Sequence, residues 1–318
     1  DLEAQGQVED LSDLDTIEEY TDQMLSQMQD EGGIYGVPTI VSAFGLYCNL
    51  DLLKEHKQEV PRNLEEWKEV CEYFKKEGIT PIIANNDISL KTLAIGRGFF
   101  SVYQQERQEE VFARLNSGEE NISQYLEPGF ALVQELIDEE YIDAEKTLDT
   151  MKTSDDLEEF AKGTSPFMLT GAWAAGRMEG MESDFAFEVD PIPALEDGGF
   201  LVINADVRLS VNVDSKHMEA AKKFVEYFTQ EDNIQKFAGQ QSSFSPLKSG
   251  KASTVSEMQP LVPCYQAGRT VIGADGLLNL PIWNLTAEAS QMLLSGESLD
   301  ETLMWLDEQA AQERRMPE

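Results

Sequence analysis

Apolar residues recur at helical spacing in many segments, and each of these segments predicts an amphipathic helix. The clearest lies at 63–78, where Asn63 is the predicted N-cap and Gly78 follows the last turn. Trp67, Val70 and Phe74 form its apolar stripe. The same spacing predicts helices at 15–30, 89–103, 108–116, 122–140, 154–162, 215–229, 231–238, 259–268, 284–295 and 298–313.

Short apolar, β-branched runs between these helices predict strands. They lie at 34–49, 79–84, 165–170, 185–189, 200–203 and 208–213. Pro38 limits the first run to an edge or a crossover, because proline cannot donate to a strand ladder. Strands and helices interleave without a repeat or a low-complexity linker. The pattern therefore predicts an α/β fold whose two lobes share several crossovers.

Composition narrows the classes of function. The 318 residues suffice for two domains, and 41% hydrophobic residues exclude a wholly disordered chain. The chain carries 60 Asp and Glu against 24 Lys and Arg, a net charge of −36. Phosphate backbones and anionic lipids would repel such a surface. No apolar run approaches the roughly 18–20 residues that span a bilayer. We therefore expect neither nucleic-acid binding nor membrane insertion by this segment.

The common catalytic and metal-binding motifs are absent from the sequence. Cys48, Cys71 and Cys264 form no CxxC pair, so we expect neither a disulfide framework nor a zinc site. His56 and His217 are interpreted as surface histidines. The sequence contains no glycine-rich phosphate loop, HExxH or GxSxG. Pairs of acids are too frequent among 60 to indicate a glycosidase. We expect no cofactor and no catalysis.

The four tryptophans fall into two groups. Trp67 and Trp305 lie on apolar helix stripes and are predicted to be core residues. Trp173 lies at a predicted strand-to-helix turn, and Trp283 follows Pro281 at the start of a helix. Large aromatic side chains at such junctions often line concave ligand sites. From position alone, a ligand contact and a packing contact both remain open for these two residues.

Five blocks follow one another along the chain: GGIYGVPTIVSAFGLYCNLDLLKEH, EVPRNLEEWKEVCEYFKKEGITPI, EEFAKGTSPFMLTGAWAAGRM, FLVINADVRLSVNVDSKHMEAAKKFVEYFTQEDNIQKF and LPIWNLTAEASQMLLSGESLDETLMWL. In this order they resemble the extracellular solute-binding proteins of carbohydrate ABC transporters, in particular the maltose-binding-protein-like group. The resemblance covers the chain from about residue 10.

The resemblance implies a two-lobe, periplasmic-binding-protein-like α/β fold with an interlobe cleft and crossover hinges. Lobe 1 would hold 1–41 and 207–259, and lobe 2 would hold 42–206 and 260–318. The crossovers would lie near 39–41, 204–207 and 258–262. Family members carry a further segment before the DLEAQGQVEDLSDL stretch, so we expect an N-terminally trimmed fragment with an incomplete lobe 1.

The resemblance also implies a set of ligand-binding residues. Trp173 matches the family's Gly-x-Trp stacking aromatic, and Trp283 matches the aromatic of the late helix. Asp87 takes the place of a polar sugar contact, Ser42 follows the first crossover, and Phe44 either lines the cleft or belongs to the core. Sugars present an apolar face to aromatic rings and hydroxyls to polar groups. With Arg97 and Arg177 as the only cations expected near this region of lobe 2, neutral sugars are favoured.

The function implied is the substrate-binding component of an ABC importer. It would capture a mono- or oligosaccharide and deliver it to the permease subunits. Such a protein would be extracellular, at the cell surface, with a lipid anchor upstream. The alternative is a sensor or scaffold that binds a sugar acid or another small solute, and a glycoside hydrolase is a third class. Fold alone does not decide among them.

Overall fold

The computed structural model of the chain describes residues 5–30, 32–178, 180–181, 183–250 and 255–315. Its internal contacts divide the chain into two compact units. Unit 1 consists of Asp1–Ser42 and Asn204–Val255, and unit 2 consists of Ala43–Ile203 and Ser256–Glu318. The chain therefore passes from one unit to the other at three places.

Unit 1 is the smaller unit, and its described part contains short helices and strands near the N-terminus followed by a helical pair. Its elements are η1 (Asp15–Glu19), α1 (Asp22–Ser26), β1 (Gln29–Asp30), β2 (Gly33–Ile34), α10 (Met218–Phe228) and α11 (Glu231–Gln240). Two long strands, β3 (Val37–Asn49) and β8 (Gly198–Leu209), each begin in one unit and end in the other.

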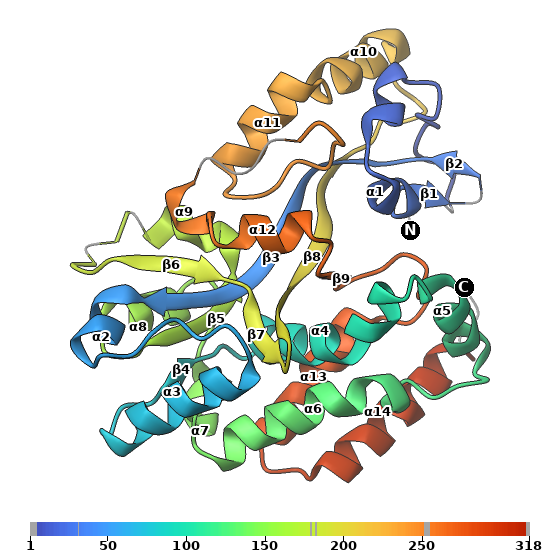
Figure 1. Cartoon of the computed structure of the whole chain (residues 1–318). Coiled ribbons are helices and arrows are strands. Elements are labelled where there is room, and N and C mark those ends of the chain that lie inside the picture. The colour runs from blue at the N-terminus through green and yellow to red at the C-terminus, as the bar shows by residue number, and fades with distance from the viewer. Residues whose placement is uncertain (1–4, 31, 179, 182, 251–254, 316–318) are drawn as a thin grey trace. The chain divides into compact units, whose positions relative to one another are not determined.

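Unit 2 contains a sheet with helices around it (Figure 1). Its shorter strands are β4 (Ile82–Ile83), β5 (Phe167–Gly171), β6 (Phe187–Asp190), β7 (Ile192–Leu195) and β9 (Thr270–Ile272). Its helices are α2 (Leu50–Glu55), α3 (Leu64–Lys76), α4 (Ile88–Gln104), α5 (Gln108–Ser117), α6 (Ser123–Asp138), α7 (Ala144–Asp149), α8 (Asp155–Ala161), η2 (Ala172–Ala174), α9 (Ala175–Met178), η3 (Ser256–Met258), α12 (Leu261–Gln266), α13 (Ile282–Leu294) and α14 (Leu299–Glu313).

The sheet has the strand order β4-β5-β3-β8-β7, with β6 also paired to β3 and β9 to β8. The pairs β4–β5 and β8–β9 are parallel, and β3 runs antiparallel to β5 and β6. The predicted α/β fold is confirmed. β3 lies inside this order, and its pairing with β5 and β6 involves Phe44–Asn49. Pro38 precedes these pairs, so it removes no donor from them.

The core of unit 2 is built around α4, which packs against α6 and α13. Most of α4 is buried, so the helix is apolar on nearly every side. Glycines allow α4 and α6 to approach closely. A Cβ on Gly129 would lie 2.1 Å from the carbonyl oxygen of Ala94, and one on Gly98 would lie 2.7 Å from that of Tyr125.

Several predicted elements differ from those observed. The single helix predicted at 15–30 is wrong: η1 and α1 are separated by Tyr20 and Thr21, whose backbones are extended. The Thr21 hydroxyl accepts a hydrogen bond from the Met24 backbone and so starts a new helix. β8 includes the strand predicted at 200–203 but ends at Leu209, so the strand predicted at 208–213 is wrong beyond its first two residues. The sequence pattern did not predict α7, β7 or β9.

All three cysteines are free and buried. None of the described helices combines the length and the hydropathy that crossing a bilayer requires. The predicted N-cap of α3 is confirmed, since Asn63 accepts a hydrogen bond from the Glu66 backbone at 3.0 Å. The capping box that Ser298 forms with Glu301 at the start of α14 is also present.

Candidate functional site

Three aromatic side chains from distant parts of the sequence meet in unit 2. Phe44 comes from β3, Trp173 from η2 and Trp283 from the first turn of α13. The Phe44 ring lies 5.0 Å from the Trp173 ring, edge-on at 83°, and 5.4 Å from the Trp283 ring at 55°. Phe44 is 3% exposed, whereas both tryptophans are partly exposed. We call these three residues the aromatic cluster, with Phe44 as its buried member.

Glycine at position 171 makes room for the Trp173 ring. Gly171 lies directly opposite Phe44 in the β3–β5 register. A Cβ on Gly171 would lie 2.2 Å from an atom of the Trp173 ring, so the ring occupies the space where a side chain would stand. The tight approach explains why a glycine precedes the tryptophan by two residues.

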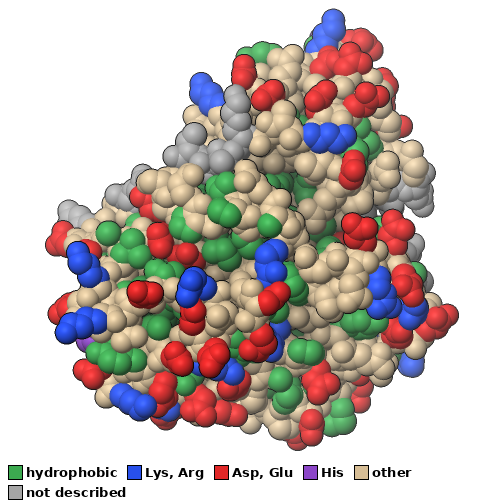
Figure 2. All heavy atoms as spheres, in the orientation of Figure 1, with side chains coloured by type: hydrophobic (Ala, Val, Ile, Leu, Met, Phe, Trp, Pro, Cys, Tyr) green, Lys and Arg blue, Asp and Glu red, His purple; other side chains and the backbone are tan. Residues whose placement is uncertain are grey.

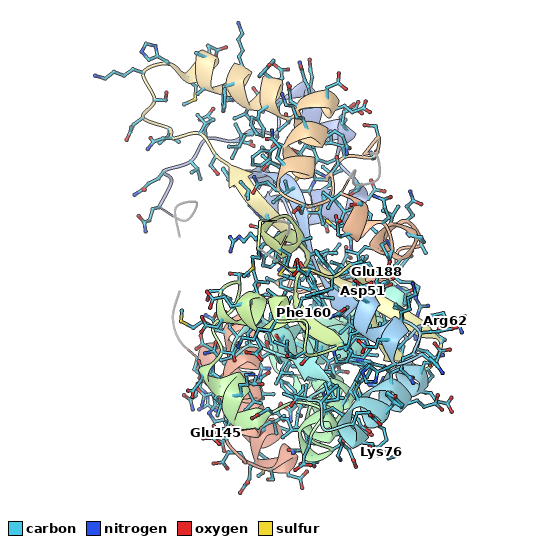
Figure 3. The ribbon with its side chains drawn as sticks, turned by 90° about the vertical axis from the view of Figure 1, so that its left-hand side faces the viewer. Asp51, Arg62, Lys76, Glu145, Phe160 and Glu188 are labelled. Atoms are coloured by element: carbon cyan, nitrogen blue, oxygen red, sulfur yellow. The ribbon has the colours of Figure 1, made fainter. Side chains whose placement is uncertain are left out.

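A buried tyrosine binds the backbone of the turn that carries Trp173. The Tyr47 hydroxyl donates to the carbonyl oxygens of Gly171 at 2.8 Å and Ala172 at 3.2 Å. Phe160, labelled in Figure 3, packs edge-on against the Tyr47 ring at 6.0 Å. The turn that carries Trp173 is therefore fixed by hydrogen bonds as well as by packing.

The turn before α4 carries Asp87, which pairs with Lys91, the residue that lies over the Trp283 ring. Asn85 is buried, and its side-chain oxygen accepts hydrogen bonds from the backbone amides of Asp87, Ile88 and Ser89. Its side-chain nitrogen donates to Asp156 at 2.9 Å, and Asp156 is fully buried. Asn85 therefore satisfies the free amides at the start of α4, and Asp156 fixes the orientation of Asn85.

Asp87 is held by two lysines. Its Oδ1 accepts from the ammonium group of Lys91 at 2.5 Å, one helical turn along α4, and its Oδ2 accepts from Lys152 in the loop between α7 and α8. Burial on its own would raise the pKa of Asp87, but the hydrogen bonds from Lys152 and Lys91 together hold this pKa below its ordinary value. Asp87 is therefore a carboxylate at neutral pH.

Lys91 connects this carboxylate to the aromatic cluster. Its side chain is only 2% exposed, and its ammonium nitrogen lies 4.2 Å from the centre of the Trp283 ring. Burial lowers the pKa of Lys91, and the ion pair with Asp87 opposes that effect. A buried ammonium group is stable only with such partners, and here it has a carboxylate and an aromatic face.

The structure therefore brings together four of the five residues predicted for the site. Trp173, Trp283, Phe44 and Asp87 all lie in unit 2, within one group of side chains. Ser42 belongs to unit 1, where it is buried. Its hydroxyl has no hydrogen-bond partner among the described residues.

Sequence reasoning missed the two lysines. The spacing of Asp87 and Lys91, four residues apart in a predicted helix, was a usable signal for an ion pair. Lys152 lies 65 residues from Asp87 in the chain, and no local pattern indicates their contact. Of the arginines that were expected here, Arg97 donates to Pro128 and Ala194. Arg177 donates to the carbonyl oxygen of Thr153, which is next to Lys152 in the loop that binds Asp87.

Two cavities of unit 2 are lined by other residues. One of about 240 Å³ lies between α7 and α8, and its lining includes Lys146, Glu159 and Lys162. One of about 370 Å³ lies along α13 and α14, and its lining includes Met292 and Trp305. The described residues contain no group of acidic, histidine and cysteine side chains that could hold a metal ion.

Comparison with known protein families shows which family the chain belongs to. The family model of bacterial extracellular solute-binding proteins matches residues 2–263. The chain belongs to this family. The match includes Ser42, Phe44, Asp87 and Trp173, whereas Trp283 lies beyond it.

Individual relatives of this solute-binding protein are distant. The multiple sugar-binding protein of Streptococcus mutans is 23% identical over 239 residues, which are 72% of this chain and 55% of that protein. This solute-binding protein thus spans little more than half the length of that relative.

Solved structures share the fold. A family 1 extracellular solute-binding protein from Bifidobacterium longum subsp. infantis matches with a TM-score of 0.77 at 20% identity, over 98% of this chain and 82% of that one. A sugar transporter from Bacillus licheniformis, solved in complex with stachyose, matches with a TM-score of 0.71 at 21% identity, over 97% and 81%. At this identity the likeness establishes the fold of this solute-binding protein and not its ligand.

Proposed function

We propose that the chain is the substrate-binding component of an ABC importer, which captures a mono- or oligosaccharide and delivers it to the permease subunits. Membership of the extracellular solute-binding family supports the binding role and an extracellular location. The curated relative is named for sugar binding, and one structural neighbour holds stachyose. On this proposal the protein acts by binding alone, without catalysis, and a lipid anchor keeps it at the cell surface.

The aromatic cluster is the observation that carries the proposal. A pyranose ring presents a face of C–H groups that packs against an aromatic ring, and its rim of hydroxyls needs directed hydrogen bonds. Trp173 and Trp283 offer partly exposed rings. Asp87, which also binds Lys152, is connected to the Trp283 ring through Lys91. An aromatic surface bordered by charged hydrogen-bonding groups matches both parts of a sugar.

Each predicted site residue then has a proposed role. Trp173 and Trp283 stack against sugar rings, and Asp87 and Lys152 contact hydroxyls. Phe44, which is buried, supports both tryptophans from behind. Ser42 contributes a hydroxyl that no described residue engages. The two structural units are proposed to be the two lobes of the family fold.

A binding experiment with matched variants tests this function. Stachyose is titrated into the protein in a calorimeter, and the unfolding midpoint is recorded with and without the sugar. A ligand that binds only the folded state raises the midpoint by mass action. Trp173→Ala is expected to weaken binding at least about tenfold, since one lost aromatic contact of about 1.4 kcal/mol has that effect.

The matched control is Trp305→Ala. Trp305 is also a partly exposed tryptophan, but it lies on α14 beside a different cavity. This variant is expected to bind stachyose like the unaltered protein. The proposal fails if a panel of mono- and oligosaccharides that includes stachyose gives no binding, or if Trp173→Ala and Trp305→Ala lose affinity equally.

A further inference from the structure

One face of the Trp283 ring is already occupied by a cation. The Lys91 ammonium nitrogen lies 4.2 Å from the ring centre, and the Lys91 side chain is almost completely buried. The attraction between a cation and an aromatic face arises from the negative charge of that face. A second cation on the opposite face would meet a ring whose charge is already partly neutralised, and it would also be repelled by Lys91.

The carboxylate of Asp87 neutralises only one of the two ammonium groups that it binds. One of its oxygens accepts from Lys91 and the other from Lys152, so both are engaged by ammonium groups. Two ammonium groups and one carboxylate leave these three residues with one surplus positive charge. Lys152 is 49% exposed against 27% for Asp87, so the more accessible group here is a hydrogen-bond donor.

We propose that Lys91, Asp87 and Lys152 form a specificity-determining cluster, which selects uncharged or acidic saccharides on the Trp283 ring and rejects saccharides that carry an ammonium group. This inference rests on the proposed function and specifies its substrate class. The Lys152 ammonium group donates to the hydroxyl, ring or carboxylate oxygens of the solute. An amino sugar presents a positive charge to the same group and is repelled.

The charge of the whole chain acts in the opposite direction. A net charge of −36 attracts cations at long range, whereas the cluster repels them at contact. Added salt screens the long-range attraction more strongly than a partly buried contact. The preference for the uncharged solute is therefore expected to increase with salt concentration, which distinguishes a local cluster from a general surface effect.

The first test compares stachyose with an analogue in which one primary hydroxyl is replaced by an ammonium group. In calorimetric titrations the protein is expected to bind stachyose at least about tenfold more tightly than the analogue. Lys152→Gln removes the surplus charge and is expected to reduce this preference severalfold. Lys162→Gln is the control, because the Lys162 side chain is also solvent-exposed, 61% against 49% for Lys152, but pairs with Glu159. Equal affinities for the two sugars, or a preference unchanged in Lys152→Gln, overturn the inference.

A second test requires no solute. Iodide and caesium ions quench tryptophan fluorescence by collision, and Trp283→Phe isolates the contribution of Trp283 by difference. Relative to the quenching of free tryptophan by the same ion, iodide is expected to quench Trp283 more efficiently than caesium, and Lys152→Gln is expected to reduce this ratio. Equal relative quenching by the two ions overturns the inference even if no sugar binds. If stachyose and its analogue bind equally tightly, the proposed function stands while the specificity cluster does not.

Discussion

At the residue scale, the geometry of the site depends on a few positions at which one residue determines how its neighbours are placed. Gly171 has no Cβ, so the Trp173 ring can pack over it, and Asn85 satisfies three amides at the start of α4. The positions of Trp173 and Trp283 at helix junctions were visible in the sequence. The contact between Lys152 and Asp87 was not, because it depends on how the loop after α7 folds back onto α4.

Gly171→Ala tests the packing of Trp173. The added methyl group would overlap the indole ring, so the ring must move away from Phe44. We expect a loss of roughly 1–3 kcal/mol in the free energy of unfolding, the usual cost of overpacking, and weaker stachyose binding. Denaturant titration and calorimetry measure the two effects. Gly180→Ala is the control, since its nearest neighbouring atom is 3.4 Å from the added Cβ; equal stability of the two variants would contradict the account.

Asp190 gives the stability a pH dependence. Burial, with a smaller contribution from the neighbouring Glu188 (Figure 3), raises the pKa of Asp190 to about 7. The folded chain therefore binds this proton more tightly than the unfolded chain does, between its ordinary pKa near 3.8 and about 7. Stability from this group is complete below that window and is lost as the pH rises through it.

Asp190→Asn is therefore expected to gain stability relative to the unaltered chain as the pH rises from about 4 to about 7. Unfolding midpoints across this range measure the difference. Asp214→Asn, at an exposed position of unit 1, serves as the surface control. A difference between Asp190→Asn and the parent chain that stays constant with pH would show that Asp190 does not titrate in this window.

At the scale of elements, helices with a clear apolar stripe and a capping residue were predicted to within a few residues. Asn63 caps its helix as expected, and Ser298 caps the helix that follows it. The prediction of one helix at 15–30 was wrong because Thr21, inside the apolar stripe, caps the start of a new helix. The two strands predicted within 200–213 were misplaced, because β8 continues through the gap expected between them and ends at Leu209. The length of a strand depends on the strands it pairs with, and the local sequence does not encode that pairing.

Gly129→Ala tests the close packing of α4 against α6. The added Cβ would lie 2.1 Å from the backbone oxygen of Ala94, and backbone atoms cannot rotate away as a side chain can. The gain in helix propensity is about 1 kcal/mol at most, so the clash is expected to dominate and to cost about 3 kcal/mol net. Ala131→Ser, at a partly exposed position of the same helix, is the control. A stabilised Gly129→Ala protein would refute this packing.

At the scale of the whole molecule, charge and connectivity are the dominant features. The resemblance implies three crossovers between two lobes. The chain passes between its two structural units at three places, and the identity of these units with the lobes is part of the proposal. Acidic side chains are scattered across the face shown in Figure 2, in keeping with a net charge of −36. Composition alone predicts the surplus of acidic residues. The contacts of the two lysines that bind Asp87 are visible only in the folded structure.

The charge predicts a dependence of stability on salt. Like charges repel one another in the compact state, and salt screens them. Raising the monovalent salt from about 10 mM to about 150 mM shortens the screening length from about 30 Å to about 8 Å, and we expect the unfolding midpoint to rise. The rise should be similar in sodium and potassium chloride. A midpoint that falls, or that changes in one salt only, would contradict general screening.

The most direct test of the account follows the four indole N–H resonances in an NMR spectrum of ¹⁵N-labelled protein during a titration with stachyose. The chain has four tryptophans, two in the aromatic cluster and two outside it, so Trp67 and Trp305 are internal controls. Assignment by single Trp→Phe variants identifies each resonance. We expect the resonances of Trp173 and Trp283 to shift and saturate together while the other two stay in place. Saturating shifts at Trp305 without shifts at Trp173 and Trp283 would contradict it.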